Sequence, residues 1–223
     1  MNKLFLLGDS TCAKKETLVQ PETGWGECFS PYLKEGWCLV NLAKNGRSTE
    51  MILREGIFLD CYYALSPGDY VMIQFGHNES KKEEYRHTEP LTSFKENLKY
   101  ITYYLQKRGA KVIFISPIAR RNFISGHMVD THLDYPLAME GLAKELNIPF
   151  IEMSQRTLNF LDKIGEEESL KYFMNFPPNT YPNYPNGNRD NTHLRVEGAE
   201  LIASMIAHEC IKSNFPFMND VKD

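Results

Sequence analysis

Short apolar runs alternate with longer amphipathic stretches along this chain of 223 residues. Strands of a parallel sheet that is covered on both faces read as such short, nearly continuous apolar runs. The runs that fit this description are Leu4–Leu7, Cys38–Ala43, Tyr70–Phe75, Lys111–Ser116 and Phe150–Ile151. The pattern therefore predicts five buried strands.

The stretches between these runs carry the spacing of helices. Apolar residues recur at helical intervals from Thr92 to Lys107, and Gly109 ends that pattern. The other helical patterns are Thr49–Leu59, Leu133–Leu146 and Val196–Ile211. Alternating strands and helices form parallel units, so we expect an α/β fold: a three-layer α/β/α sandwich with a five-stranded, mostly parallel sheet in flavodoxin-like order. Ligands of such sheets bind outside the carboxyl ends of the strands.

One long segment, Asn175–Asn191, breaks this alternation. It is rich in proline, asparagine and tyrosine, and we expect no regular element in it. Loops of this length are uncommon in compact domains and are often functional. The chain shows no linker, repeat or low-complexity tract, so residues 1–223 are expected to form a single domain.

Charge and composition narrow the functional classes. The net charge of −4 and the pI near 5.9 give no basic footprint for nucleic acid. We interpret the short basic run Ala119–Arg121 as an ordinary solvated face. No run of about 18 apolar residues is present to span a bilayer. We therefore expect neither a nucleic-acid partner nor a membrane partner.

The five cysteines are odd in number and lack the spacing of metal ligands. Cys38, Cys61 and Cys210 lie in apolar surroundings and are expected to be buried thiols. Met1–Leu7 leads directly into Gly8, which leaves no room for a secretory signal. If Met1 is the native start, these features indicate a cytoplasmic protein.

Candidate chemistry is concentrated in four short blocks: GDST at residues 8–11, NGRST at 45–49, QFGHNE at 74–79 and DNTH at 190–193. Ser10 follows the first predicted strand, where a turn would bring its hydroxyl to the rim of the sheet. A serine hydroxyl becomes an effective nucleophile when an imidazole accepts its proton. His193, with Asp190 three residues before it, offers that imidazole and a carboxylate to orient it.

These residues also have other interpretations. Ser10 could cap a helix N-terminus, because serine is favoured at that position. Asp190 and His193 could be a loop acceptor and a helix-start residue, or two metal ligands. Cys12 is an alternative nucleophile, although it belongs to no matching motif.

The same blocks contain donors for an oxyanion. A tetrahedral acyl intermediate carries negative charge on the former carbonyl oxygen, so fixed N–H groups must point at that oxygen. Gly46 follows the second predicted strand, and its missing side chain lets its N–H approach a substrate closely. The side-chain amide of Asn78 and the backbone N–H of Ser10 complete the set. Alternatively, Gly46 and Asn78 are ordinary turn residues.

Four further residues are candidates for binding the substrate: Trp25, His77, Tyr181 and Tyr184. The aromatic faces of such residues can stack on sugar rings, and the asparagines beside the two tyrosines can bond to sugar hydroxyls. Packing within the loop is the alternative role for the tyrosines.

Together the four blocks resemble those of the SGNH (GDSL-like) hydrolase superfamily, whose Ser, Gly, Asn and His correspond to Ser10, Gly46, Asn78 and His193. Within it, the chain is most similar to the rhamnogalacturonan acetylesterase group. The supporting strings are GDSTCA, TGWGE, VNLAKNGRST, PGDYVMIQFGHNE and DNTHLRVEGA, which are spread over most of the chain. Glu79 is a departure, because the group usually has Asp there. Any hydrogen bond that orders this loop is expected to differ.

The resemblance implies the SGNH hydrolase fold and a serine esterase that needs neither a metal nor another cofactor. It also implies a small-molecule or oligosaccharide substrate, namely acetylated sugars or pectic oligosaccharides. His193, oriented by Asp190, would then take the proton of Ser10, and an acetyl-enzyme would form and be hydrolysed.

Other functions stay open at this point. Lipases and thioesterases share the chemistry of the superfamily, and a non-catalytic carbohydrate-binding protein could keep its fold. The blocks also faintly resemble those of binuclear metallophosphoesterases. That class, however, needs His where this chain has Thr11, and the His–Asn order in GHNE is reversed.

Overall fold

The structure is a computed structural model that describes residues 1–82 and 85–219. Its centre is a five-stranded sheet in the order β2-β1-β3-β4-β7, in which all neighbouring strands run parallel. The strands are β1 (Asn2–Gly8), β2 (Trp37–Asn41), β3 (Tyr70–Gln74), β4 (Lys111–Ile115) and β7 (Phe150–Ile151). The five predicted strands, their flavodoxin-like order and the α/β fold class are confirmed.

Alternate residues of the central strands face two separate hydrophobic clusters. In β1, Leu4 and Leu6 belong to one cluster, whereas Phe5 and Leu7 belong to the other. β3 and β4 divide their side chains in the same way. Burial on both faces is the reason that these strands read as unbroken apolar runs.

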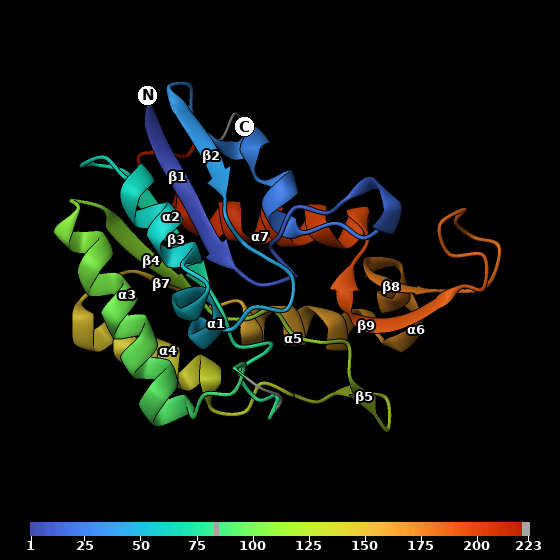
Figure 1. The fold of residues 1–223 in the computed structure, drawn as a ribbon. Coiled ribbons are helices and arrows are strands. Elements are labelled where there is room, and N and C mark those ends of the chain that lie inside the picture. The colour runs from blue at the N-terminus through green and yellow to red at the C-terminus, as the bar shows by residue number, and fades with distance from the viewer. Residues whose placement is uncertain (83–84, 220–223) are drawn as a thin grey trace.

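Helices cover both faces of the sheet, which gives the three layers (Figure 1). The helices that pack on the Phe5 face are α1 (Thr49–Arg54), α2 (Ile57–Ala64), α3 (Lys95–Lys107) and α4 (Tyr135–Leu146). Those that pack on the Leu4 face are α5 (Ser154–Ile164) and α7 (Val196–Lys212). Shorter helical turns are Thr17–Val19, Trp25–Cys28, Ser30–Tyr32, Pro90–Phe94, α6 (Glu166–Ser169) and Leu170–Tyr172.

Some predicted helices differ in their bounds. The pattern at 49–59 belongs to two helices, because Gly56 adopts a φ of +73° between α1 and α2 and interrupts the first helix. α3 begins at Lys95, after a π-helical turn at Pro90–Phe94. The sequence pattern did not predict α5, whose exposed face is strongly polar.

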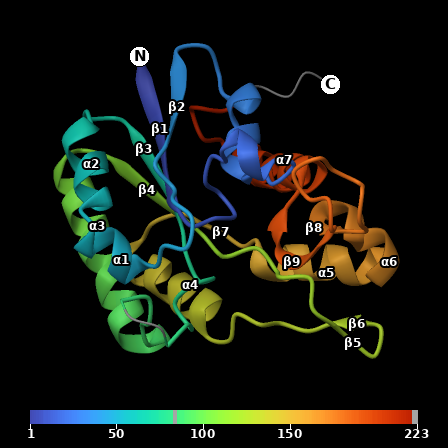
Figure 2. The same ribbon diagram turned by 45° about the vertical axis from the view of Figure 1, so that its right-hand side comes forward.

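The segment predicted to be irregular is instead bracketed by two strands. β8 (Phe173–Phe176) and β9 (Asn188–Leu194) form an antiparallel ribbon that lies to the side of the central sheet, near α5, α6 and α7 (Figure 2). The prediction of no regular element in 175–191 is therefore wrong at both ends of that segment. A second small hairpin pairs β5 (Phe123–Ile124) with β6 (His127–Met128).

Two expectations about burial are corrected. Arg121, predicted on a solvated face, is 6% exposed because it donates to the hydroxyl of Ser169 and the carbonyl oxygen of Glu166 inside the fold. Cys38 is half-buried because it lies on the edge strand β2, whereas Cys61 and Cys210 are buried as expected. Within the described ranges, no helix combines the length and apolar character that crossing a bilayer requires.

Two helical glycines give a matched test of the packing. A Cβ on Gly198 in α7 would lie 2.1 Å from the carbonyl oxygen of Tyr172, so Gly198→Ala must displace α7. We expect this change to lower the free energy of unfolding by about 1–3 kcal/mol. Gly141 in α4 has open space at the same position, so Gly141→Ala should be neutral or stabilising by up to about 1 kcal/mol. Urea unfolding measures both values, and equal effects would contradict the close approach at Gly198.

Candidate active site

Ser10 lies in the turn that follows β1, at the carboxyl edge of the sheet. The carboxylate of Asp9 shapes this turn by accepting hydrogen bonds from the backbone N–H and the hydroxyl of Thr11, both at 2.9 Å. The carbonyl oxygen of Asp9 accepts two more, from the N–H groups of Cys12 and Ala13. No helix begins at residues 9–16, all of which the structure describes, so Ser10 is not a helix cap.

A bulge in β9 presents Asp190 and His193. Phe173 pairs with Leu194 and Asn175 with Arg189, so residues 190–193 stand opposite a single residue of β8. The Oδ1 atom of Asp190 holds the bulge by accepting the N–H groups of Thr192 at 2.7 Å and His193 at 3.0 Å. Bulges commonly re-aim side chains beside active sites.

The buried Arg121 supports the same bulge from the interior. Its backbone N–H donates to the carbonyl oxygen of Asn191 at 2.8 Å, and its guanidinium donates to Asn191 Oδ1 at 3.2 Å. The bulge is therefore tied to the segment that follows β4, and is not a free loop.

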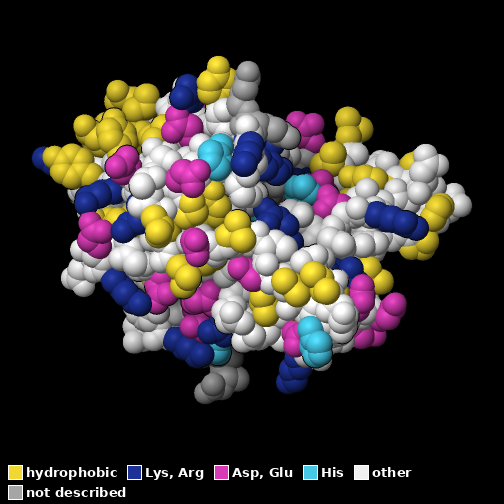
Figure 3. Space-filling model, turned by 90° about the horizontal axis from the view of Figure 1, so that it is seen from below, with side chains coloured by type: hydrophobic (Ala, Val, Ile, Leu, Met, Phe, Trp, Pro, Cys, Tyr) yellow, Lys and Arg dark blue, Asp and Glu magenta, His cyan; other side chains and the backbone are white. Residues whose placement is uncertain are grey.

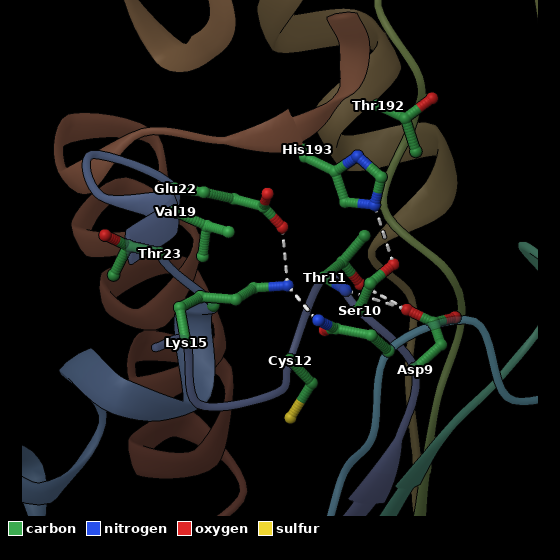
Figure 4. A network of polar contacts seen from close by, with 12 residues as sticks. Asp9, Ser10, Thr11, Cys12, Lys15, Val19, Glu22, Thr23, Thr192 and His193 are labelled. Carbon is green, nitrogen blue, oxygen red and sulfur yellow. Dashed lines mark hydrogen bonds and ion pairs between the residues drawn. The ribbon is translucent and has the colours of Figure 1, made fainter. Parts of the chain in front are cut away.

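Ser10, His193 and Asp190 form a continuous chain of hydrogen bonds. The Nε2 atom of His193 lies 2.9 Å from Ser10 Oγ, and its Nδ1 atom lies 2.6 Å from Asp190 Oδ2. A dashed line in Figure 4 marks the first of these hydrogen bonds. Because Nδ1–H donates to the carboxylate, Nε2 carries the lone pair that can accept the serine proton. The arrangement can generate an oxygen nucleophile.

The charges of this pair stabilise each other. Burial lowers the pKa of His193, but the hydrogen bond and the charge of Asp190 outweigh burial and raise that pKa above its ordinary value. Glu22 acts in the same direction and Lys15 opposes it. Burial alone raises the pKa of Asp190, yet its bonds to His193 bring it down to about 2. Asp190 is therefore a carboxylate at neutral pH.

Gly46 and Asn78 border the pocket in which Ser10 lies. Gly46 has a φ of +75°, a conformation that glycine adopts without strain. The side-chain amide of Asn78 donates one hydrogen to the carbonyl oxygen of Arg47 at 3.0 Å, which leaves its second hydrogen for another acceptor. Among the described residues, no protein atom accepts from the N–H of Ser10 or of Gly46. Three donors are thus available at this pocket.

The pocket has a volume of about 490 Å³ and a polar, charged lining. Figure 3 views this face of the molecule and shows basic side chains gathered around a hollow that also exposes a histidine. The lining residues are Ser10, Glu22, Asn45, Gly46, His77, Asn78, Lys81, Arg86, Arg120, Asp190, Thr192 and His193.

Of the four predicted substrate-binding residues, His77 lines the pocket. Its Nδ1 atom lies 3.1 Å from Nε2 of the buried His132, and burial holds the pKa of His77 well below its usual range. Trp25 was assigned wrongly: it is 1% exposed, and its indole N–H donates to Gln74 Oε1 at 2.6 Å within the core.

Tyr181 and Tyr184 do not join the pocket lining in this structure. Both rings pack edge-on against Phe176 at the tip of the β8–β9 ribbon. The hydroxyl of Tyr184 donates to the carbonyl oxygen of Val19 at 3.1 Å. Tyr184 thus fixes the ribbon against the segment around Val19, and Tyr181 accepts a hydrogen bond from Arg195 at 3.2 Å. Both tyrosines therefore take the loop-packing role.

Sequence reasoning missed several charged residues of the site. Lys15 is 5% exposed, and its Nζ atom lies 2.7 Å from both Glu22 Oε1 and Asn45 Oδ1. Arg120 donates to the carbonyl oxygens of His77 and Thr131. The sequence could have indicated Arg120 by its position, because it follows the predicted strand Lys111–Ser116 and so lies at the carboxyl edge of the sheet, where ligands bind.

Glu79, the departure from the usual Asp, is fully buried. Its Oε1 atom accepts the N–H of Thr49 at 2.9 Å, and Oε2 accepts those of Gly76 at 2.9 Å and Asn78 at 3.1 Å. Burial raises the pKa of Glu79 to about 7, although the backbone donors oppose that rise. One carboxylate therefore connects the loops that follow β2 and β3.

The alternatives for this chemistry are less well supported. Cys12 is fully buried, and burial raises the pKa of its thiol well above the usual value, so it has no access to a substrate. In the part of the chain that the structure describes, no three His, Cys, Asp or Glu side chains are grouped so as to hold a metal ion.

No protein-family model matches the chain, but several known proteins are similar to it. It is 37% identical over 206 residues to the rhamnogalacturonan acetylesterase RhgT of Bacillus subtilis (strain 168), a match that covers 92% of this chain and 88% of that protein. Among solved structures, the YXIM protein of Bacillus subtilis matches with a TM-score of 0.82 at 23% identity, over 97% of this chain and 58% of that one. Axe2, an acetylxylan esterase from Geobacillus stearothermophilus, matches with a TM-score of 0.62 at 17% identity, over 93% of each chain. The solved structures, which include a putative GDSL-like lipase from Parabacteroides merdae, show that the fold is shared. The chain belongs to the rhamnogalacturonan acetylesterases and is a carboxylic ester hydrolase.

Proposed function

We propose that this protein is a serine acetylesterase that removes O-acetyl groups from acidic pectic oligosaccharides of the rhamnogalacturonan type. The chemistry rests on one observation, the hydrogen-bonded chain from Ser10 through His193 to Asp190, with distances of 2.9 and 2.6 Å. A nucleophile, a base and an orienting carboxylate in this order are the parts that covalent acyl transfer requires.

In the first half of the reaction, His193 Nε2 takes the proton of Ser10 as Oγ attacks the acetyl carbonyl carbon. The carbonyl oxygen becomes an oxyanion, which accepts hydrogen bonds from the N–H groups of Ser10 and Gly46 and from the amide of Asn78. When the intermediate collapses, the sugar alkoxide leaves and takes the proton from His193, and Ser10 holds the acetyl group as an ester.

In the second half, water replaces the sugar. His193 takes a proton from the water as its oxygen attacks the acetyl carbon, and the same donors stabilise the second oxyanion. Collapse breaks the bond to Ser10 Oγ, which recovers the proton from His193, and acetate is released.

The charge of the pocket supports an acidic sugar. The two acidic members of the lining, Glu22 and Asp190, are already engaged with Lys15 and His193. Arg120 bonds to neutral oxygens, and Lys81 lines the same pocket. An excess of positive charge attracts anionic ligands. Rhamnogalacturonan carries uronate carboxylates, whereas the xylan backbone is neutral, and the relative RhgT is named for the former.

The lining also bears on lipase and thioesterase activity. Of the lining residues that the structure describes, none is hydrophobic, so a long acyl chain would find no apolar wall. A short acyl group such as acetyl needs no such wall.

Ser10→Ala tests the nucleophile. The variant should lower kcat on an aryl acetate by at least about 10³-fold, because no other hydroxyl occupies that position. It should also lose covalent labelling by a fluorophosphonate probe, while Ser204→Ala, a change on an exposed face of α7, should retain both activity and labelling. A fully active Ser10→Ala enzyme would show that another group is the nucleophile.

The pH profile tests the base. Protonated imidazole cannot accept the serine proton, so kcat/KM should fall tenfold per pH unit below the pKa of His193, which Asp190 holds above its ordinary value. Asp190→Asn removes that carboxylate, so the pKa of His193 should shift downward and kcat should fall on the order of 10³- to 10⁴-fold. NMR titration of the imidazole measures the shift, and an unchanged or higher pKa in the variant would be inconsistent with the pairing.

Neighbouring lysines test the acidic substrate. Lys81 is exposed and lines the pocket, whereas Lys82 is exposed outside the lining. Lys81→Ala should raise KM for acetylated galacturonate-containing oligosaccharides by roughly three- to fivefold, and high salt should remove the difference. Lys82→Ala should leave KM unchanged. If Lys81→Ala raises the KM for neutral acetylated xylo-oligosaccharides by the same factor, the proposal that charge determines the specificity is wrong.

A further inference from the structure

The segment 45–49, here named the oxyanion loop, is held at both ends by buried ionisable side chains. At its start, Lys15 Nζ donates to Asn45 Oδ1 at 2.7 Å. At its end, Glu79 Oε1 accepts the backbone N–H of Thr49 at 2.9 Å. Gly46 lies between these two attachments. Neither Lys15 nor Glu79 has a role in the reaction steps described above.

The ammonium group of Lys15 is fixed in position by its burial and by its two partners, Glu22 and Asn45. Its side chain is 1% exposed, and its charge is matched by Glu22, with Nζ and Oε1 2.7 Å apart. Figure 4 shows Lys15 extended toward Ser10 from one side, with a dashed line that joins its ammonium group to Glu22. Burying an ammonium group is costly unless its hydrogen-bond partners are present. The hydrogen bond from this fixed ammonium group therefore restrains the position of Asn45.

Glu79 couples the oxyanion loop to the loop that carries Asn78. One carboxylate oxygen binds the N–H of Thr49, and the other binds those of Gly76 and Asn78 at 2.9 and 3.1 Å. The amide of Asn78 in turn donates to the carbonyl oxygen of Arg47 within the oxyanion loop. The two loops that carry Gly46 and Asn78 are thus joined through a single buried carboxylate and one amide.

We infer that Lys15 and Glu79 are positioning residues, which fix the N–H of Gly46 and the amide of Asn78 relative to Ser10 so that the oxyanion site exists before substrate binds. This inference rests on the proposed function, in which those groups stabilise the oxyanion. Preorganised donors lower the barrier because they need no rearrangement when charge develops. A side chain that acts in this way changes kcat more than it changes substrate binding.

The most direct variants alter Asn45, because its side chain is exposed and both replacements below keep it small. Asn45→Ala removes the acceptor for Lys15, whereas Asn45→Asp retains an oxygen at that position. Lys15→Met and Glu79→Gln remove the two buried charges themselves. Lys14→Met and Glu16→Gln are the matched controls, since each makes the same change of charge at an exposed neighbouring position.

All variants are compared at pH 8.5 on an aryl acetate. This pH lies above the pKa of about 7 for Glu79. Lys15 also lowers the pKa of His193, so its removal at neutral pH would lower activity through protonation of the base. The alkaline assay separates that effect from a displaced donor.

We expect kcat to fall about 10- to 100-fold in Asn45→Ala, Lys15→Met and Glu79→Gln, less than the loss of an entire donor. KM should change by less than about threefold, and Asn45→Asp should recover most of the loss. Affinity for phenylboronic acid, which forms a tetrahedral adduct on Ser10, should fall by the same factor as kcat/KM. The two control variants should match the parent protein.

Two outcomes are kept apart by Ser10→Ala. If that variant is inactive while Asn45→Ala and Glu79→Gln keep normal kcat and boronate affinity, the positioning role is wrong and the proposed function stands. If Ser10→Ala keeps its activity, the proposed function itself fails. Should Glu79→Gln or Lys15→Met not fold, the Asn45 pair decides: equal losses in Asn45→Ala and Asn45→Asp would overturn the inference.

Discussion

The hydrogen bond between Ser10 and His193 joins residues that are 183 positions apart, and the rest of the site depends on it. The parallel sheet places Ser10, because all its strands end at one edge and the turn after β1 lies there. His193 is placed by β9, which is not part of that sheet. A bulge that is held by Asp190 and by the buried Arg121 turns His193 toward Ser10.

Around this bond, buried charges are paired mostly with fixed groups. Glu79 binds three backbone N–H groups, Asp9 binds the N–H and hydroxyl of Thr11, and Arg121 binds a carbonyl and side-chain oxygens. A buried charge whose partners are fixed penalises any motion that separates them, because an unpaired charge is costly at low dielectric. Such groups hold loops that, on sequence grounds alone, look free to move.

The parts of the molecule that were predicted from the sequence are those that depend on local patterns. β1, β3 and β4 read as apolar runs because alternate residues enter two clusters, and Ser10, Gly46, Asn78 and His193 stand in short motifs close to strand ends. The β8–β9 ribbon could not be read in this way. Its pairing joins distant residues and is broken by the bulge, so no regular alternation of apolar residues marks it.

Trp25 shows why composition alone misleads in this site. Its aromatic face made Trp25 a candidate for stacking on a sugar ring, yet it lies in the core. The glycines on either side of it are tightly packed: a Cβ on Gly24 would lie 2.1 Å from the carbonyl oxygen of Ala13, and one on Gly26 would lie 2.5 Å from Asn41 Nδ2. They let this segment pack directly against the turn after Ser10, with Trp25 fixed by Gln74 in the core.

That packing assigns the geometry of the reacting groups and the binding of the substrate to different sets of residues. The reacting groups lie on backbone that is close-packed from beneath, by Trp25, Lys15 and Glu79, so their geometry is set by the core. The cations Lys81, Arg86 and Arg120 occupy the lining between that floor and the solvent. Under the proposed function, changes in those outer side chains therefore alter which sugar is held without disturbing Ser10 and His193. A substitution of Lys15 or Glu79 has the opposite consequence, because it displaces Gly46 and Asn78 relative to Ser10 whatever the substrate.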